Sequence, residues 1–169
     1  MLFRSVQNFP NVLTVGQPQD ITATFIGSTD ALCNGSNDGT AQVNVANGTP
    51  GYAYLWTGAL PGHTSVMPSP TDLFSDTYNL RITDANACVK NFGGIVFIDE
   101  PDDITNTITV TDVLCNSGIT GAIQIDPLGG TLPYTFAWTG TGSGLIPGDE
   151  DQTGLSDGFY DLTITDANS

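Results

Sequence analysis

A long segment of the sequence recurs 82 positions further along, and this repeat restricts the fold more than any other feature. Residues 29–34 (TDALCN) return as residues 111–116 (TDVLCN), and residues 82–86 (ITDAN) return unchanged as residues 164–168. Recurrence at a fixed spacing, without a gap, is typical of tandem structural units that fold in the same way. The sequence therefore predicts two copies of one unit.

The repeat also sets the expected limits of each unit. Residues 6–9 (VQNF) match residues 89–92 (VKNF) at an offset of 83, so we interpret residues 1–18 as the tail of a preceding unit. The first complete unit is expected over residues 19–101. The second is expected over residues 102–169 and stops before its last strand. We therefore expect a fragment of a longer tandem array, which also accounts for the lack of a secretory signal at Met1.

Within each unit the hydrophobic pattern has a period of two. Apolar and aromatic residues alternate along residues 52–56 (YAYLW), 78–82 (YNLRI) and 134–138 (YTFAW), and Gly, Pro, Asn and Asp separate such runs. This pattern predicts short strands and no helices. About seven strands in roughly 82 residues indicate an all-β fold of tandem immunoglobulin-like β-sandwiches. Four aromatic residues are expected in the cores, the tyrosines as tyrosine corners: Trp56, Trp138, Tyr78 and Tyr160.

The charge of the chain excludes two classes of partner. Eighteen Asp and Glu residues face three Lys and Arg residues, which gives a formal charge of -15. Nucleic acid is excluded because each phosphate would add like-charge repulsion. An anionic membrane surface is disfavoured for the same reason, and no apolar run approaches the roughly 18 residues that membrane insertion needs.

Three cysteines follow the repeat. Cys33 and Cys88 fall within the first unit, and Cys115 matches Cys33 in the second. We expect a Cys33–Cys88 disulfide, with the partner of Cys115 lying beyond the end of the chain. Structural disulfides form in oxidising compartments, so this pairing indicates a secreted protein at the cell surface. Two unpaired, buried thiols are the alternative.

The sequence gives little support for an enzyme. The single histidine, His63, lies in a Pro- and Gly-rich loop, and Leu145 takes its place in the second unit. A histidine-dependent triad would have to use a residue that the duplication does not preserve. We expect no catalytic site and no required cofactor.

Calcium is the one metal that the acidic loops suggest. Asp149, Asp151, Thr153 and Asp157 follow the spacing of the first part of an EF-hand loop, but Tyr160 stands where the bidentate Glu belongs. A second candidate site lies between the units and contains Asp99, Asp102 and Asp103. Plain acidic loops are the alternative interpretation at both places.

The combined motifs resemble the SprB repeat family. The resemblance is carried by residues 33–41 (CNGSNDGTA), 129–138 (GGTLPYTFAW) and 77–88 (TYNLRITDANAC), and it covers residues 20–169. Departures are Gly51, which replaces the proline before Tyr52, and Ser117, which displaces the glycine expected after Cys115 and Asn116.

This resemblance implies a segment of a very large, repetitive adhesin of the kind that gliding bacteria export and move along the cell surface. It implies that the repeats form a stalk or filament without catalytic residues. The expected partners are neighbouring repeats of the same chain, a surface polysaccharide, or other copies in a filament. Two alternatives stay open: a carbohydrate-binding or accessory tandem of a secreted enzyme, and a self-assembling subunit joined through edge strands or a donated terminal strand.

Overall fold

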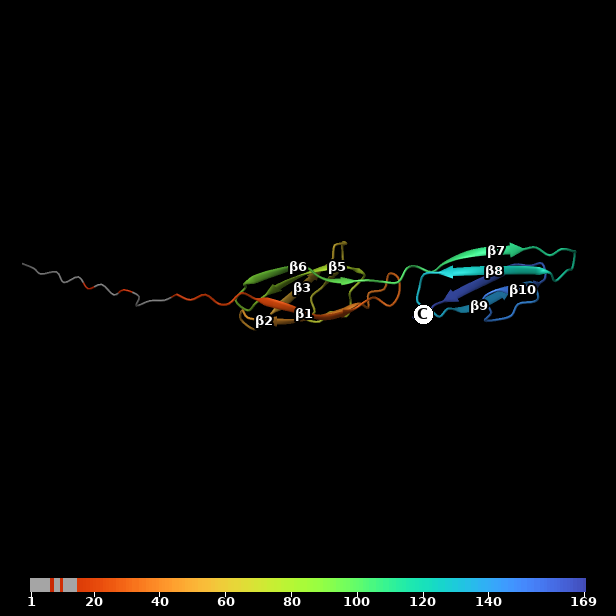
Figure 1. Ribbon diagram of the computed structural model, residues 1–169. Coiled ribbons are helices and arrows are strands. Elements are labelled where there is room, and N and C mark those ends of the chain that lie inside the picture. Colours follow the sequence, from red (N-terminus) through yellow and green to blue (C-terminus); the bar gives the residue numbers. More distant parts are fainter. Residues whose placement is uncertain (1–6, 8–9, 11–14) are drawn as a thin grey trace, which may run out of the picture.

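The computed structural model describes residues 7, 10 and 15–169, and every regular element in these residues is a β-strand. The strands form two groups that follow one another along the chain (Figure 1). The all-β prediction is confirmed, and each group is a pair of facing antiparallel sheets.

The first unit contains six strands, one fewer than the seven that we expected from the pattern. Its sheets are β1-β2 and β4-β3-β5-β6, and each neighbouring pair is antiparallel. The strands are β1 (Thr22–Thr29), β2 (Thr40–Ala46), β3 (Ala53–Thr57), β4 (Thr64–Ser65), β5 (Asp76–Thr83) and β6 (Val89–Ile98).

The second unit contains five described strands. They form the sheets β10-β8-β7 and β11-β9. The strands are β7 (Thr105–Thr111), β8 (Gly121–Leu128), β9 (Thr135–Gly140), β10 (Gln152–Leu155) and β11 (Tyr160–Thr165). By the 82-residue offset, β9 and β11 correspond to β3 and β5, and no described strand of this unit corresponds to β6. The immunoglobulin-like identity of the sandwiches stays a prediction.

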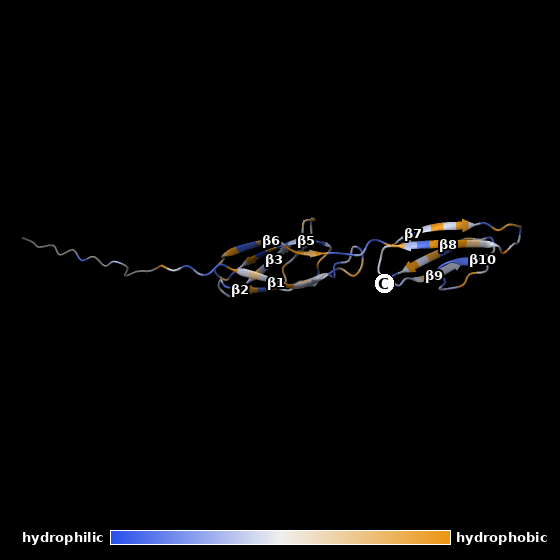
Figure 2. Ribbon diagram, in the orientation of Figure 1, coloured by the Kyte–Doolittle hydropathy of each residue, from blue (hydrophilic) through white to orange (hydrophobic). Residues whose placement is uncertain are grey.

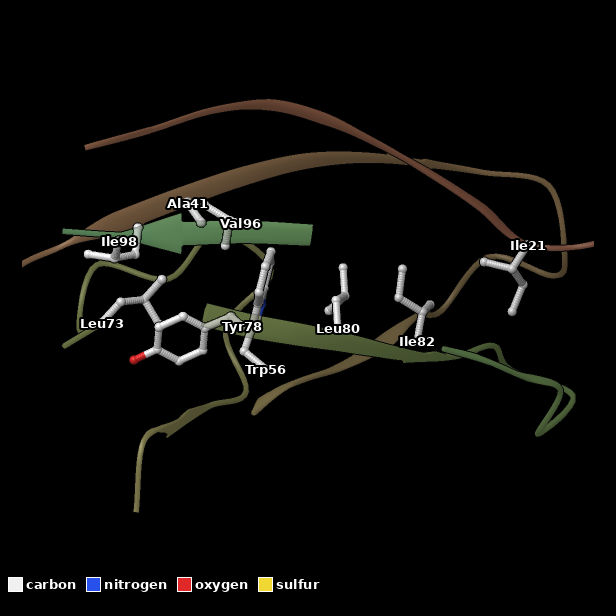
Figure 3. Close-up of a cluster of buried hydrophobic side chains, with 9 residues drawn as sticks. All are labelled: Ile21, Ala41, Trp56, Leu73, Tyr78, Leu80, Ile82, Val96 and Ile98. Atoms are coloured by element: carbon white, nitrogen blue, oxygen red, sulfur yellow. The ribbon is translucent and has the colours of Figure 1, made fainter. Parts of the chain in front are cut away.

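The core of the first unit lies between its two sheets (Figure 3). Strand β5 alternates strictly, so Tyr78, Leu80 and Ile82 point inward while the residues between them are exposed. Strand β6 adds Val96 and Ile98 to the same core.

The second core is smaller and more open. Its buried members are Ile123, Ile125, Trp138 and Leu155. The residues of β11 that match the inward face of β5 are only half-buried: Tyr160, Leu162 and Ile164. The first unit differs because β6 covers this part of its core.

The strands run between two ends of each unit, which we call its poles. In the first unit, the proximal pole consists of residues 19–21, 47–51 and 84–88, where Gly48 N donates to Gln19 O over 3.3 Å. The distal pole consists of residues 30–38 and 98–101, where Ala31 N donates to Asp99 O over 2.9 Å. The second unit has the same poles, and the chain terminus after β11 returns to the proximal one, beside the first unit (Figure 1).

The interval between the units is short. Strand β6 ends at Ile98 and β7 begins at Thr105, so residues 99–104 connect the units without a strand of their own. The unit limits of 101 and 102 stay a prediction within this interval. Most of the tail predicted over residues 1–18 falls outside the described residues, since only residues 7, 10 and 15–18 of it are described.

Candidate functional site: the poles of the repeat

The ITDAN motif forms a tight turn at the proximal pole. The carboxylate of Asp84 accepts hydrogen bonds from three backbone N–H groups: Thr49 at 2.9 Å, Asn86 at 2.9 Å and Cys88 at 2.8 Å. Backbone hydrogen bonds, that of Thr49 first among them, hold the pKa of Asp84 below its usual range. One side chain therefore joins the β5–β6 turn to the loop between β2 and β3.

The second unit builds the same turn. Asp166 accepts from Thr131 N at 2.8 Å, Asn168 N at 3.0 Å and Ser169 N at 3.0 Å, and these bonds likewise lower its pKa. The duplicated motif thus preserves a duplicated hydrogen-bond network. This explains why residues 82–86 recur unchanged.

A glycine makes room for this carboxylate. Gly48 has a φ of 66°, and a Cβ there would lie 2.8 Å from Ile21 Cγ1 and 3.1 Å from Asp84 Oδ2. Gly130 has a φ of 58° and meets Ile104 and Asp166 in the same way. Glycine is needed here for its left-handed conformation and for the missing side chain.

The distal pole presents a polar loop that contains Cys33. Its conformation is held by Asp38, whose Oδ1 accepts from Leu32 N at 3.0 Å and from Ser36 Oγ at 2.6 Å. The hydroxyl of Ser36 is the main cause that lowers the pKa of Asp38. The loop also contacts the connector, since Asn34 Nδ2 donates to Pro101 O at 3.1 Å.

The distal pole of the first unit contacts the proximal pole of the second. Asn168, in the second ITDAN turn, donates from Nδ2 to Leu32 O at 2.6 Å and to Thr131 Oγ1 at 3.1 Å. Beside this contact, Gly35 N donates to Glu100 Oε2 at 2.6 Å. A turn of one unit is therefore hydrogen-bonded to a loop of the unit before it.

The four aromatic residues predicted for the cores differ between the units. Trp56 and Tyr78 are fully buried in the first. In the second, Trp138 is 8% exposed and Tyr160 is half-buried. The indole N–H groups of Trp56 and Trp138 donate to Met67 O and Asp149 O, each at 2.9 Å.

Both tyrosines form corners. The Tyr78 hydroxyl donates to Phe74 O at 3.2 Å, and that of Tyr160 donates to Ser156 O at 2.8 Å, in each case four residues upstream. This hydrogen bond to the preceding backbone is what a tyrosine corner requires.

The predicted Cys33–Cys88 disulfide is wrong, because all three cysteines are free and these two lie at opposite poles. Cys33 follows β1 at the distal pole, whereas Cys88 ends the Asp84 turn at the proximal pole. Eight residues of β1 separate the poles by about 26 Å, and a disulfide needs Cα atoms within about 7 Å. The pairing expected for Cys115 stays a prediction, because its expected partner lies outside the sequence.

The acidic residues proposed as calcium ligands are used in several separate contacts. Asp151 Oδ1 accepts from Ile125 N at 3.0 Å, and Asp99 Oδ1 accepts from Glu100 N at 3.0 Å. Across the described residues, no three His, Cys, Asp or Glu side chains come together as a metal site would require. Calcium at Asp149, Thr153 and Asp157, or at Asp102 and Asp103, stays a prediction.

His63 has a structural environment. Its Nδ1 lies 3.0 Å from Asp76 Oδ2, and its ring stacks on Phe74 with centroids 4.7 Å apart. Burial raises the pKa of Asp76, but the N–H groups of Leu60, Ala59 and Thr77 together with His63 outweigh burial and lower it. The Asp76 carboxylate is therefore already hydrogen-bonded to the loop that contains Leu60 and His63.

The contact residues at the junction were not predicted from the sequence. Asn34, Glu100 and Asn168 lie in polar turns, and polar turns are common in any β-protein. The one signal that could have pointed to Asn168 is its place in a motif that recurs unchanged.

Two facing-sheet units joined in tandem by hydrogen-bonded polar loops define a tandem-repeat β-sandwich protein. The SprB repeat family matches this chain twice, over residues 27–60 and residues 107–143. Each matched segment contains a distal loop and the tryptophan strand that follows it. Two segments of the chain thus match the SprB repeat, and this match suggests a repeat segment of a large cell-surface protein.

No curated protein and no solved structure matches the chain. Within the part of the chain that the structure describes, no helix has the length and hydrophobicity to cross a membrane.

Proposed function

We propose that this chain is a structural and adhesive segment of a large secreted filament at the cell surface, resembling gliding-motility adhesins. The observation that carries this proposal is the contact between successive repeats, in which Asn168 donates to Leu32 O while Asn34 and Gly35 bind the connector. Hydrogen bonds on both sides of a short connector limit the rotation of one unit against the next. Such an arrangement suits an extended array.

The acidity supports the same function. A formal charge of -15 spread over 169 residues makes neighbouring filaments repel one another and keeps a long repetitive protein in solution. The proposal needs no cofactor and assigns the chain no catalytic role.

The carbohydrate-binding alternative has less support. Sugar-binding platforms use exposed aromatic rings, whereas both tryptophans are buried and their N–H groups are already bonded to backbone carbonyls. A polysaccharide partner would have to be bound by the polar loops or by exposed phenylalanines such as Phe97 and Phe159.

The experiment is surface labelling of intact cells of the source organism with an antibody raised against residues 15–169. We expect labelling of unpermeabilised cells, its removal by brief protease treatment, and weaker attachment to glass after deletion of the gene. Labelling only after permeabilisation would refute the proposal. A glycan array probed with the same polypeptide would promote the alternative if a sugar bound and a substitution of an exposed aromatic such as Phe159 abolished binding.

A further inference from the structure

An Asn-Gly pair at the distal pole of the first unit lies against a carboxylate. Asn34 and Gly35 are both exposed, and both bind the connector of residues 99–104. Asn34 Nδ2 donates to Pro101 O at 3.1 Å, and Gly35 N donates to Glu100 Oε2 at 2.6 Å. The connector is hydrophilic over most of its length, so water has access to this contact (Figure 2).

The sequence Asn-Gly has a chemistry of its own. Because glycine has no side chain to obstruct the approach, its backbone nitrogen can attack the side-chain amide carbon of the preceding asparagine and close a succinimide ring. A backbone N–H is a very weak acid, so the nitrogen attacks efficiently only when a base removes its proton. A general base has to lie within about 2.6–3.2 Å of the atom whose proton it takes. Glu100 Oε2 meets this requirement at Gly35 N.

We propose that Asn34 is a site of self-modification, at which Glu100 is the general base for conversion of the asparagine to aspartate and isoaspartate. The Glu100 carboxylate takes the proton of Gly35 N, and this nitrogen forms a bond to Asn34 Cγ. The Cγ–Nδ2 bond then breaks, and Glu100 returns the proton to the leaving ammonia. Water opens the succinimide at either of its carbonyls, which gives the two products. The reaction consumes one water and releases one ammonia, and Glu100 ends as a carboxylate again.

The second Asn-Gly pair of the chain faces a different group. Gly48 N donates to Gln19 O at 3.3 Å, and a backbone carbonyl does not take a proton at neutral pH. Asn47 has a φ of 63°, and its Nδ2 donates to Thr22 Oγ1 at 3.2 Å. The two pairs therefore differ in the group that accepts from the attacking nitrogen, and Asn47 is a comparison within the same molecule.

The second unit does not repeat the site. At the 82-residue offset, Asn116 takes the place of Asn34, but the next residue is Ser117, whose side chain obstructs attack by its own nitrogen. The modification is therefore expected where the distal pole of the first unit meets the connector.

The reaction would loosen this junction. A carboxylate at position 34 has no N–H to donate to Pro101 O, and it adds a negative charge close to that of Glu100. Isoaspartate also adds a methylene to the backbone, which displaces Gly35 N from Glu100. Contacts on one side of the connector are therefore lost, and the age of the protein sets how far this loss has gone.

The experiment is incubation of the 169-residue chain at neutral pH, followed by peptide mapping that separates asparagine, succinimide, aspartate and isoaspartate. We expect Asn34 to react faster than Asn47. Glu100→Gln should slow the reaction at Asn34 at least about tenfold and leave the rate at Asn47 unchanged. Asp102→Asn removes the same charge from an exposed position of the same connector and should change neither rate.

The same variants in urea separate the effect of the fold from that of the local sequence. In the unfolded chain both pairs should react at similar rates, and Glu100→Gln should have no effect, because the connector no longer holds the carboxylate at Gly35. If Glu100→Gln reacts at Asn34 as fast as the parent, or faster, the hydrogen bond only protects the nitrogen and the proposal is overturned. Equal rates at Asn34 and Asn47 in the folded chain would also overturn it.

Hydrogen exchange tests the effect on the junction. Asn34→Asp and Asn37→Asp add the same charge at exposed positions of the same loop, and we expect faster exchange over residues 30–38 and 99–104 only in Asn34→Asp. Equal exchange in the two variants would refute the loosening. This inference goes beyond the proposed function and does not depend on it, since the reaction at Asn34 is measured on the isolated chain, wherever the protein is found in the cell.

Discussion

Leu80 and Leu162 occupy the same position in the two units but differ in what covers them. Leu80 is 1% exposed and lies between Trp56 on β3 and Phe92 on β6. Leu162 lies opposite Trp138 on β9 in the same register, is half-buried, and lines an open cavity between β7 and β11. Replacement of each by alanine therefore compares one residue with and without a covering strand.

We expect Leu80→Ala to lower the free energy of unfolding of the first unit by about 3 kcal/mol, because a well-packed leucine leaves a cavity that the core cannot fill. Leu162→Ala should lower that of the second unit by about 1 kcal/mol, since less apolar surface is buried to begin with. Each of these energies is a difference between a variant and its parent, so the uncertain surface area of the unfolded chain largely cancels.

Native-state hydrogen exchange followed by mass spectrometry measures both effects in one molecule, because peptides from β5 and β11 report on each unit separately. The measurement is made on the 169-residue chain. Equal losses in the two units would refute the view that β6 accounts for the difference.

Three other predictions concern the poles. Hydrogen bonds lower the pKa of Asp84 in the folded state, so the stability that its charge provides is present above about pH 4 and is lost as the pH falls through the folded-state pKa. The urea midpoints of the parent and of Asp84→Asn should therefore converge in acid. A difference between the two midpoints that stays constant with pH would contradict this prediction. Gly48→Ala should destabilise the first unit by about 1–3 kcal/mol in thermal unfolding, because residue 48 has a positive φ and its new Cβ would meet Ile21. Gly27→Ala is the control, since a Cβ at that position would meet open space and should change stability little. Oxidised monomer mapped by mass spectrometry should contain no peptide that links Cys33 to Cys88, and recovery of that link as the main product would show that the poles are misplaced.

Much of the fold follows from short-range patterns in the sequence. Alternation along residues 78–82 correctly identifies the inward face of β5, and the duplicated tryptophans mark equivalent places in both units. Periodicity succeeds here because the two faces of a strand differ in their exposure to water.

The incorrect Cys33–Cys88 prediction shows a limit of inference from sequence repeats. The repeat correctly aligns Cys33 with Cys115, but an alignment of equivalent positions contains no information on which pole each position occupies. The direction of β1 decides that, and with it the separation of Cys33 from Cys88. The Asn168–Leu32 contact was equally inaccessible, because it joins residues 136 positions apart through the placement of one unit on the next.

The arrangement of the first and last strands of a complete unit has a mechanical consequence. A pull along an array enters the first unit at Ile21, ahead of β1, and leaves it after Ile98, at the end of β6. Strand β1 is hydrogen-bonded to β2, and β6 to β5, so these two strands belong to different sheets. Tension between them is transmitted across the sandwich by the packing of side chains such as Val96 and Ile98, not along a ladder of backbone hydrogen bonds sheared in parallel. The packing of core side chains, and not only the hydrogen bonds between strands, therefore sets the force at which a repeat would unfold.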